Sequence, residues 1–469
     1  MYRFDLSAIP KYQDIEELIK VFLPPEDYVL CLPGEEPPEG TYKDIDLTGA
    51  DPGDKNDVKR HIYRALSKET DSDPEWGIMT GVRPVKLVGM LLRREEKTGR
   101  DAEEAVAKVL QEEYLLTCEK AAELLDIYRY QQEAVGEAPP DTVGLYLGIP
   151  FCPTRCVYCS FPSNQAPAED IALYLTALRR EVEYVGRLMK SLGVRCESVY
   201  FGGGTPTTLN APQLKELLAL CDRELPMEGC REFTLEAGRP DTIDVEKLVI
   251  AKDHGVTRIS INPQTMKDET LQLIGRGHTV AQIYDAFDCA AKAGITDINC
   301  DLIAGLPLET FPDFVDSLDK VLALRPTNVT VHTLAVKRGS KLKDADEHYH
   351  YKYGERVQQM LAHSRRILGD AGFRPYYLYR QKHMAGSGEN TGYCLPGTEG
   401  VYNIRIMEER QPIIALGAGG ISKSYDPRSG HVARAANVTN YRQYTERIEE
   451  MCQRKDKLFQ PFIKEEPSC

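Results

Sequence analysis

Three cysteines lie close together in the segment Ile149–Cys159, at positions 152, 156 and 159, with the spacing C-x3-C-x2-C. Cysteine thiolates hold iron-sulfur clusters, and three of them on one loop can bind three irons of a 4Fe-4S cluster. The fourth iron then has no protein ligand and can bind another molecule. The motif therefore predicts a cluster that binds a substrate, rather than one that only transfers electrons.

The same spacing resembles the signature of the radical S-adenosylmethionine superfamily. The resemblance implies that S-adenosylmethionine binds the open iron through its amino and carboxylate groups. One electron from the reduced cluster would then break a carbon-sulfur bond and release a 5'-deoxyadenosyl radical, which abstracts an unactivated hydrogen. Zinc is the alternative, but it would require a fourth ligand from a second C-x2-C or H-x3-H element, and none follows. We therefore expect an iron-sulfur cluster.

Length and composition limit the class of protein. The chain has 469 residues, too many for one ordinary core, so we expect two or three domains. The net charge of -14 argues against broad nucleic-acid binding, which needs a sizeable basic face. The sequence has no apolar run of about 18 residues and no signal-peptide core, and its thirteen scattered cysteines fit a reducing compartment. We predict a cytoplasmic protein that binds neither membranes nor nucleic acid.

Short apolar strands alternate with helices from residue 143 to residue 333. Gly193, Gly255 and Gly294 each end a helix before the next strand, which makes the βα unit an internal repeat. Six such units form a parallel sheet that curls into a full or partial barrel, with function at the carboxyl ends of the strands. The predicted strands are 143–147, 198–201, 232–236, 258–261, 297–302 and 328–333, and the helices between them are 169–192, 211–224, 245–254, 280–293 and 312–324.

The rest of the chain is predicted to form two further parts. We expect an N-terminal α/β accessory domain over residues 1–140, a partial (β/α)6 barrel over 141–335 and a C-terminal α+β domain over 336–469 that covers the substrate. Trp76, the only tryptophan, is expected to anchor the accessory domain against the next one. Periodicity also predicts single helices over 102–133, 353–371 and 441–455 and an aromatic strand over 373–379.

Polar residues follow the carboxyl ends of four predicted strands. Gly202–Gly204 let the backbone approach a ligand with exposed N–H groups, although a tight turn would also explain them. Glu236 can accept hydrogen bonds from an ammonium group, or it caps the next helix. Gln264 suits ribose hydroxyls and Arg276 a carboxylate. Asp301 should point inward, where an unpaired carboxylate is costly, so we expect it to have a partner.

Together these motifs resemble the oxygen-independent coproporphyrinogen III oxidase family over residues 143–335. The long N-terminal extension and the segment Glu236–Pro240 resemble its Gram-positive branch, coproporphyrinogen dehydrogenase. The resemblance implies that Cys152, Cys156 and Cys159 hold the cluster. It implies contacts to one or two S-adenosylmethionine molecules from Tyr146, Tyr158, Gly203, Gly204, Thr205, Glu236, Gln264, Arg276 and Asp301.

The family reaction, as the resemblance implies it, is an oxidative decarboxylation. A hydrogen leaves the β-carbon of a propionate on rings A and B of coproporphyrinogen III, and loss of an electron and CO2 leaves a vinyl group. Two turnovers give protoporphyrinogen IX. The resemblance also implies a tetrapyrrole substrate, a small reductant protein of the flavodoxin or ferredoxin type, and a monomer. Candidates to meet the substrate carboxylates are Arg374, Arg380, Lys382 and Arg405, although a solvated basic face would also explain them.

Two relatives that share the barrel, a haem chaperone and a radical methyltransferase that opens haem, are alternatives, and a scaffold without activity is a third. The chaperone carries a His-Asn-x-x-Tyr-Trp haem-binding motif. The corresponding stretch here, Glu389–Cys394, keeps the asparagine and the tyrosine but lacks the axial histidine. Other histidines, among them His332 and His363, could bind haem, although such residues more often pack or face solvent.

The chain also departs from well-studied oxidases beside the cysteine motif. Those enzymes have a fourth cysteine where this chain has Phe161, and a histidine where it has Gly148. Neither position binds the cluster in the family. We therefore expect the cluster to be retained while its surroundings differ.

Overall fold

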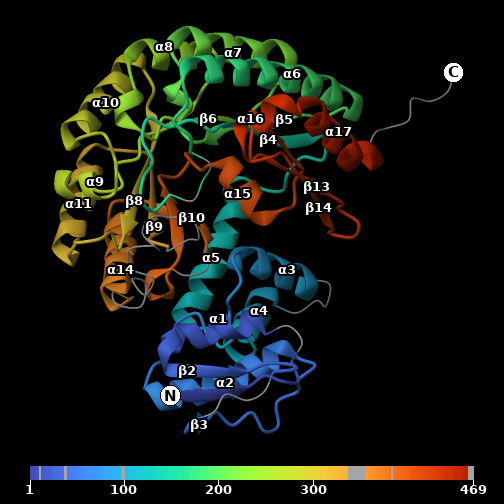
Figure 1. Cartoon of the computed structure of the whole chain (residues 1–469), viewed down its shortest axis with the longest axis vertical. Coiled ribbons are helices and arrows are strands. Elements are labelled where there is room, and N and C mark those ends of the chain that lie inside the picture. The colour runs from blue at the N-terminus through green and yellow to red at the C-terminus, as the bar shows by residue number, and fades with distance from the viewer. Residues whose placement is uncertain are drawn as a thin grey trace, which may run out of the picture.

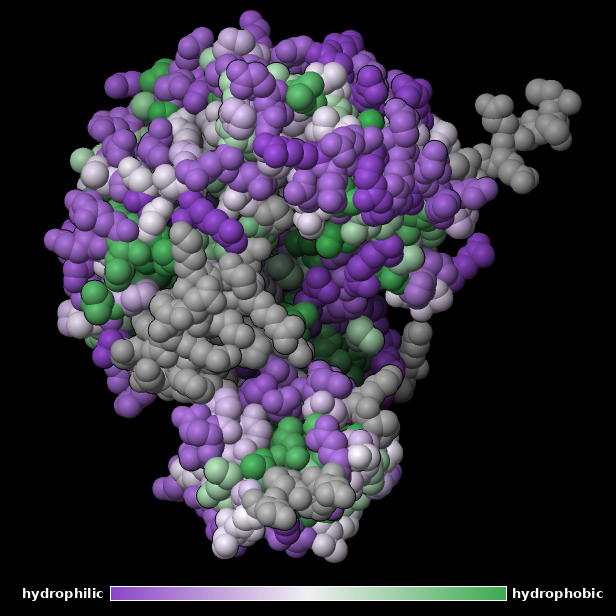
Figure 2. Space-filling model, viewed as in Figure 1, coloured by the Kyte–Doolittle hydropathy of each residue, from purple (hydrophilic) through white to green (hydrophobic). Residues whose placement is uncertain are grey.

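The computed structural model describes residues 1–9, 12–35, 40–96, 101–159, 161, 163–335, 354–381 and 384–462. Figure 1 shows a small N-terminal part below a larger body, with helix α5 (Cys118–Ala134) running between them. Figure 2 shows a hollow between these two parts on the face in view, with hydrophobic residues inside it.

The N-terminal part has a three-stranded parallel sheet in the order β2-β1-β3. Phe4 of β1, Ile15 of α1 and Ile62 of α2 are completely buried in one core, because apolar residues recur at helical spacing along both helices. The elements before α5 are β1 (Tyr2–Asp5), α1 (Gln13–Phe22), β2 (Tyr28–Cys31), β3 (Lys43–Asp44), α2 (Lys55–Thr70), α3 (Pro84–Glu96) and α4 (Ala102–Glu112).

Six parallel strands form the predicted sheet in the spatial order β9-β8-β7-β6-β5-β4, and helices arc around its outside (Figure 1). Each predicted strand and helix is present, with small differences at the ends, so the partial (β/α)6 barrel is confirmed. The strands are β4 (Thr142–Ile149), β5 (Arg195–Gly203), β6 (Glu232–Glu236), β7 (Arg258–Ser260), β8 (Asp297–Ala304) and β9 (Asn328–Thr333). The helices are α6 (Ala168–Leu192), α7 (Ala211–Glu224), α8 (Val245–Asp253), α9 (Asp268–Leu273), α10 (Val280–Ala293) and α11 (Phe311–Ala323).

The strands near the C-terminus continue the barrel sheet on both edges. On one edge β11 pairs with β9, and β10 pairs with β11, both in antiparallel orientation. On the other edge β12 pairs in parallel with β4 and is followed by β13 and β14 in antiparallel pairing. The division of the chain into three domains stays a prediction. The C-terminal elements are α14 (Gly354–Asp370), β10 (Arg374–Tyr379), β11 (Asn390–Cys394), α15 (Val401–Glu408), β12 (Ile413–Leu416), β13 (Ile421–Tyr425), β14 (Val432–Ala436), α16 (Tyr441–Glu446) and α17 (Ile448–Phe459).

Two helices predicted as continuous are each divided in the structure. Between α4 and α5, Leu115 takes a left-handed φ of 57° and the Thr117 hydroxyl accepts from the backbone N–H of Lys120, which caps a new helix. Between α16 and α17, Arg447 leaves the helical conformation with ψ at 28°. The helix predicted over 353–371 and the strand over 373–379 are confirmed as α14 and β10.

Helix α15 lies against β4 and β5 and carries Arg405, one of the cations predicted to meet substrate carboxylates. That prediction is wrong, because the Arg405 side chain is only 1% exposed and donates two hydrogen bonds of 2.9 Å to Glu197 on β5. Arg380 is also buried, and its guanidinium donates to the carbonyls of Ser387 and Gly388. Both arginines are structural.

The other two side chains predicted to meet substrate carboxylates are Arg374 and Lys382. The Arg374 guanidinium lies 4.1 Å from the centre of the Tyr130 ring, as in a cation–π contact. Lys382 lies outside the described residues.

Trp76 connects the N-terminal part to the larger body, as predicted. Its indole N–H donates to Glu389 Oε2 at 3.1 Å, and Glu389 Oε1 accepts from Lys120 and Arg365, each at 3.0 Å. Glu389 is 2% exposed, and an unpaired carboxylate buried to that extent would be strongly destabilising. The three donors come from the N-terminal part and from α14, so this one carboxylate ties both to the C-terminal strands.

The buried pair of Arg405 and Glu197 predicts a stability effect. Replacing Arg405 with leucine leaves the Glu197 carboxylate without its bidentate partner, and we expect the free energy of unfolding to fall by about 3–5 kcal/mol in urea denaturation. The control is Arg366→Ala, whose pair with Asp370 is largely exposed and should contribute at most about 1 kcal/mol. Equal effects of the two substitutions would contradict a structural role for Arg405.

Candidate functional site

The cysteine loop begins where β4 ends and is held at both sides. Asn164 N–H donates to Pro150 O at 2.9 Å and Cys152 N–H donates to Asn164 O at 3.0 Å, which closes the loop on itself. On the far side Val157 N–H donates to Ile274 O at 3.0 Å, and the Thr154 hydroxyl donates to Gly275 O at 2.9 Å. Hydrogen bonds on both sides therefore hold in place the loop that carries the three thiols.

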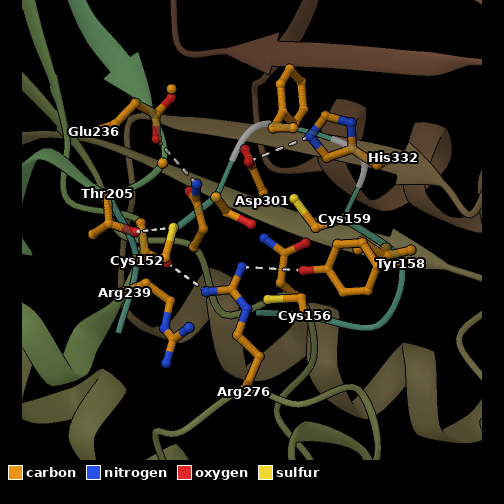
Figure 3. A pocket seen from close by; sticks show the side chains of 18 of the residues that line it. Cys152, Cys156, Tyr158, Cys159, Thr205, Glu236, Arg239, Arg276, Asp301 and His332 are labelled. Carbon is orange, nitrogen blue, oxygen red and sulfur yellow. Dashed lines mark hydrogen bonds and ion pairs between the residues drawn. The ribbon is translucent and has the colours of Figure 1, made fainter. Parts of the chain in front are cut away.

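Cys152, Cys156 and Cys159 all line one cavity of about 370 Å³ (Figure 3). Burial raises the pKa of the Cys152 and Cys159 thiols, although the Thr205 hydroxyl, 3.4 Å from Cys152 Sγ, opposes this for Cys152. Binding to iron would deprotonate them outright. Among the described residues no three His, Cys, Asp or Glu side chains converge on a single metal ion. Three soft thiolates around one cavity fit a cluster.

The glycines at the end of β5 pack against the cysteine loop. Gly204 N–H donates to Ile149 O at 2.8 Å and Thr205 N–H donates to Phe151 O at 2.7 Å. These two N–H groups are therefore not exposed to a ligand, contrary to the expectation from the sequence. A Cβ on Gly204 would lie 2.5 Å from Phe151 O, which explains the glycine by close packing of two backbones.

Two half-buried carboxylates face the cavity from β6 and β8, the strands on either side of β7. Glu236 accepts from the Tyr200 hydroxyl and from Asn262, and burial together with the nearby Asp301 raises its pKa to about 7. Asp301 accepts from Asn299 Nδ2 at 2.9 Å and lies 3.4 Å from His332 Nε2, so the expected partner is confirmed. Burial alone would raise the pKa of Asp301, but His332 and Asn299 outweigh burial and lower it.

Two arginines border the cysteine loop. Arg276 donates to Gly238 O at 2.6 Å and to the Tyr158 hydroxyl at 3.3 Å. Arg239 is 3% exposed, forms a bidentate pair with Asp241, and donates to the Thr154 hydroxyl at 2.9 Å. The Arg276 guanidinium can thus also donate to an anionic ligand, whereas Arg239 mainly holds the cysteine loop in place.

The cavity gathers every residue predicted to bind the cluster or S-adenosylmethionine. Gln264 takes a left-handed φ of 70° and donates its backbone N–H to Asp301 O, which turns the chain after β7 towards the cavity. Binding of S-adenosylmethionine by these residues stays a proposal. The predicted residues on the cavity wall are Tyr146, Cys152, Cys156, Tyr158, Cys159, Gly203, Gly204, Thr205, Glu236, Gln264, Arg276 and Asp301.

The sequence did not single out several other lining residues. Arg239 lies in the segment Glu236–Pro240, but the sequence predicts no role for it. His332 is predicted only as a candidate haem ligand. Phe161 was noted only as a departure from related enzymes. Tyr379 and Gln381 come from β10 and the residues after it. His332 is the last residue but one of β9, so the rule of strand carboxyl ends could have found it.

Comparison with known proteins places this site in a family. Residues 146–321 match the Radical SAM superfamily. The oxygen-independent coproporphyrinogen-III oxidase-like protein HemZ of Bacillus subtilis (strain 168) is 39% identical over 414 residues, which are 87% of this chain and 82% of the relative. The chain belongs to the oxygen-independent coproporphyrinogen III oxidase family of radical S-adenosylmethionine enzymes. Membership implies a 4Fe-4S cluster and S-adenosylmethionine as cofactors.

Other members of the superfamily are more distant. The haem chaperone HemW of Lactococcus lactis subsp. lactis (strain IL1403) is 31% identical over 279 residues, which are 58% of this chain and 68% of the relative. The solved structure of coproporphyrinogen III oxidase (HemN) from Escherichia coli has a TM-score of 0.54 at 22% identity and covers 69% of this chain and 73% of that one, which supports the family fold. Within the described ranges, every helix is too short or too polar to span a bilayer.

The cysteine loop makes a prediction for iron content. We expect Cys156→Ala to lose most of the iron and sulfide bound after anaerobic reconstitution, because two thiolates cannot hold three irons. Cys289→Ala is the control, since this partly buried thiol lies on α10 and does not line the cavity, and it should keep its iron. Iron analysis and the EPR spectrum of the reduced cluster measure the effect. Equal iron in both variants would exclude the assignment.

The raised pKa of Glu236 predicts pH-dependent binding of S-adenosylmethionine. An ammonium ligand favours the carboxylate, so below about pH 7 binding must displace a proton, and the Kd should fall by up to about tenfold per pH unit as the pH rises towards 7. Above that pH the Kd should level off. Equilibrium dialysis of the reconstituted protein would measure this, and Glu236→Gln should remove the dependence.

Glu309→Gln is the matched control for this test. Burial also raises the pKa of Glu309, but its side chain bonds to Thr265 and does not line the cavity. This variant should keep the pH dependence. A flat profile in the wild-type protein would show that Glu236 does not receive the ligand ammonium.

Proposed function

We propose that this protein decarboxylates two propionates of coproporphyrinogen III to vinyl groups, giving protoporphyrinogen IX. The observation that carries the proposal is the single cavity in which the three cysteines meet the strand-end residues Glu236, Arg276 and Asp301, in a chain of this family. We further propose that a small flavodoxin- or ferredoxin-type protein supplies the electrons.

When bound at Cys152, Cys156 and Cys159 and the residues beside them, the cluster and S-adenosylmethionine would supply the radical chemistry that removes a hydrogen atom from the propionate β-carbon, and the electron released with CO2 would return to the oxidised cluster. The chain's own residues bind and orient. Glu236 accepts the ligand ammonium, and Arg276 offers its fork to the ligand carboxylate. Asp301, whose pKa is lowered, stays charged and can accept from ribose hydroxyls. The half-buried tyrosines Tyr146 and Tyr200 line the inner wall with nearly parallel rings.

Haem binding is the second candidate, because relatives named haem chaperones match this chain. The position that corresponds to their axial histidine is Glu389, which is buried and already paired with Trp76, Lys120 and Arg365. Haem bound as in the chaperones would need a different ligand. This favours the decarboxylation over haem binding.

The test is an anaerobic turnover assay. Reconstituted protein receives a reductant, S-adenosylmethionine and coproporphyrinogen III, and both 5'-deoxyadenosine and the mass of the tetrapyrrole are followed. We expect loss of two CO2 per tetrapyrrole with one deoxyadenosine for each, and neither product with Cys156→Ala. Deoxyadenosine without a change in tetrapyrrole mass would reject this substrate while keeping the radical chemistry, and haem would then be tested.

A further inference from the structure

One wall of the cavity consists of residues that bind neither the cluster nor S-adenosylmethionine in the proposed arrangement. It is formed by the ends of β9 and β10 together with one residue of the cysteine loop. A substrate that gives up a hydrogen must reach the same cavity, so this wall is the surface available to it. The residues that matter on it are Phe161, His332, Leu334, Tyr379 and Gln381.

Phe161 gives this wall an apolar surface. It follows the last cysteine of the motif and is 61% exposed although it borders the cavity. Large aromatic side chains usually bury most of their surface, and one that stays exposed beside a binding cavity favours a ligand with an apolar ring face. Leu334 on the same wall is 2% exposed and adds no such surface.

His332 is the imidazole on this wall. Among the described residues that line the cavity, the two guanidinium groups are those of Arg239, which is paired with Asp241, and Arg276, which donates to Gly238 O and Tyr158. The His332 side chain is 23% exposed, so part of the ring remains open to a ligand.

The contacts of His332 orient the ring. Nε2 lies 3.4 Å from Asp301 Oδ2 (Figure 3). Nδ1 lies 3.5 Å from the Tyr379 hydroxyl, the long limit for a hydrogen bond. A carboxylate from a ligand can therefore take the Nδ1 N–H without losing a strong internal bond.

We propose that His332 holds a carboxylate of the substrate while Phe161 packs against the ring that bears it. The site would thus recognise an apolar ring system with acidic side chains, and the His332–Asp301 pair would place the propionate beside the radical. This inference rests on the proposed function, which it extends by naming the residues that choose the substrate.

The test measures binding without turnover. Coproporphyrin III, the fluorescent oxidised form, and its tetramethyl ester are titrated anaerobically into full-length reconstituted protein with S-adenosylmethionine present. The wild-type protein should bind the acid more tightly than the ester. His332→Asn should weaken binding of the acid about ten- to hundredfold, because a charge-assisted hydrogen bond is lost, and should leave the ester unchanged. Phe161→Ala should weaken both ligands, and Phe161→Leu should restore part of the loss.

The matched control is His254→Asn, since His254 lies at the end of α8, pairs with Asp222 and does not line the cavity. Iron content confirms that each variant is folded. Unchanged discrimination between acid and ester in His332→Asn overturns the inference, as does a wild-type protein that binds neither ligand. A His332-dependent preference for the acid in a protein that releases no CO2 supports the inference while the proposed reaction fails, so the two failures are distinguishable.

Discussion

The site depends on the close packing of two backbones, the cysteine loop after β4 and the glycine loop after β5. Hydrogen bonds of 2.8 and 2.7 Å join Gly204 to Ile149 and Thr205 to Phe151, and no side chain fits between them. Because this packing fixes where the cysteine loop leaves the sheet, it also fixes where the thiols enter the cavity. The glycines are needed for this contact whatever ligand lies beside them.

The two carboxylates of the cavity lie in different electrostatic environments. Glu236 and Asp301 are both half-buried carboxylates, but their environments move their pKa values in opposite directions. Glu236 has only neutral hydrogen-bond donors, from Tyr200 and Asn262, whereas Asp301 has His332. Divergent environments of this kind assign different roles to like groups. Glu236 is suited to gain its charge when a cationic ligand arrives, and Asp301 is charged beforehand.

Outside the cavity, buried ion pairs connect parts of the chain that apolar packing alone would otherwise hold together. Glu389 joins the N-terminal part and α14 to β11, and Glu197 joins α15 to β5. Breaking such pairs leaves a buried charge, so the surrounding elements must stay together. The resemblance to haem chaperones implies a histidine at the position of Glu389, and in this chain that position serves the fold.

The sequence by itself determined the six βα units, because strand and helix periodicities differ and capping glycines separate them. It also determined many of the cavity residues, since the carboxyl ends of parallel strands meet at one edge, where Cys152 follows β4, Glu236 ends β6 and Asp301 lies in the second half of β8. The breaks at Leu115 and Arg447 could not be predicted, because helical periodicity continues across both. Only the tertiary structure decided which cations are free: Arg405 and Arg380 carry the same charge as a substrate-binding arginine would, but burial beside Glu197 and backbone carbonyls assigns both to the fold. It also brought His332 and Phe161, 171 positions apart, to one wall, because that proximity depends on the closure of the sheet rather than on any local pattern.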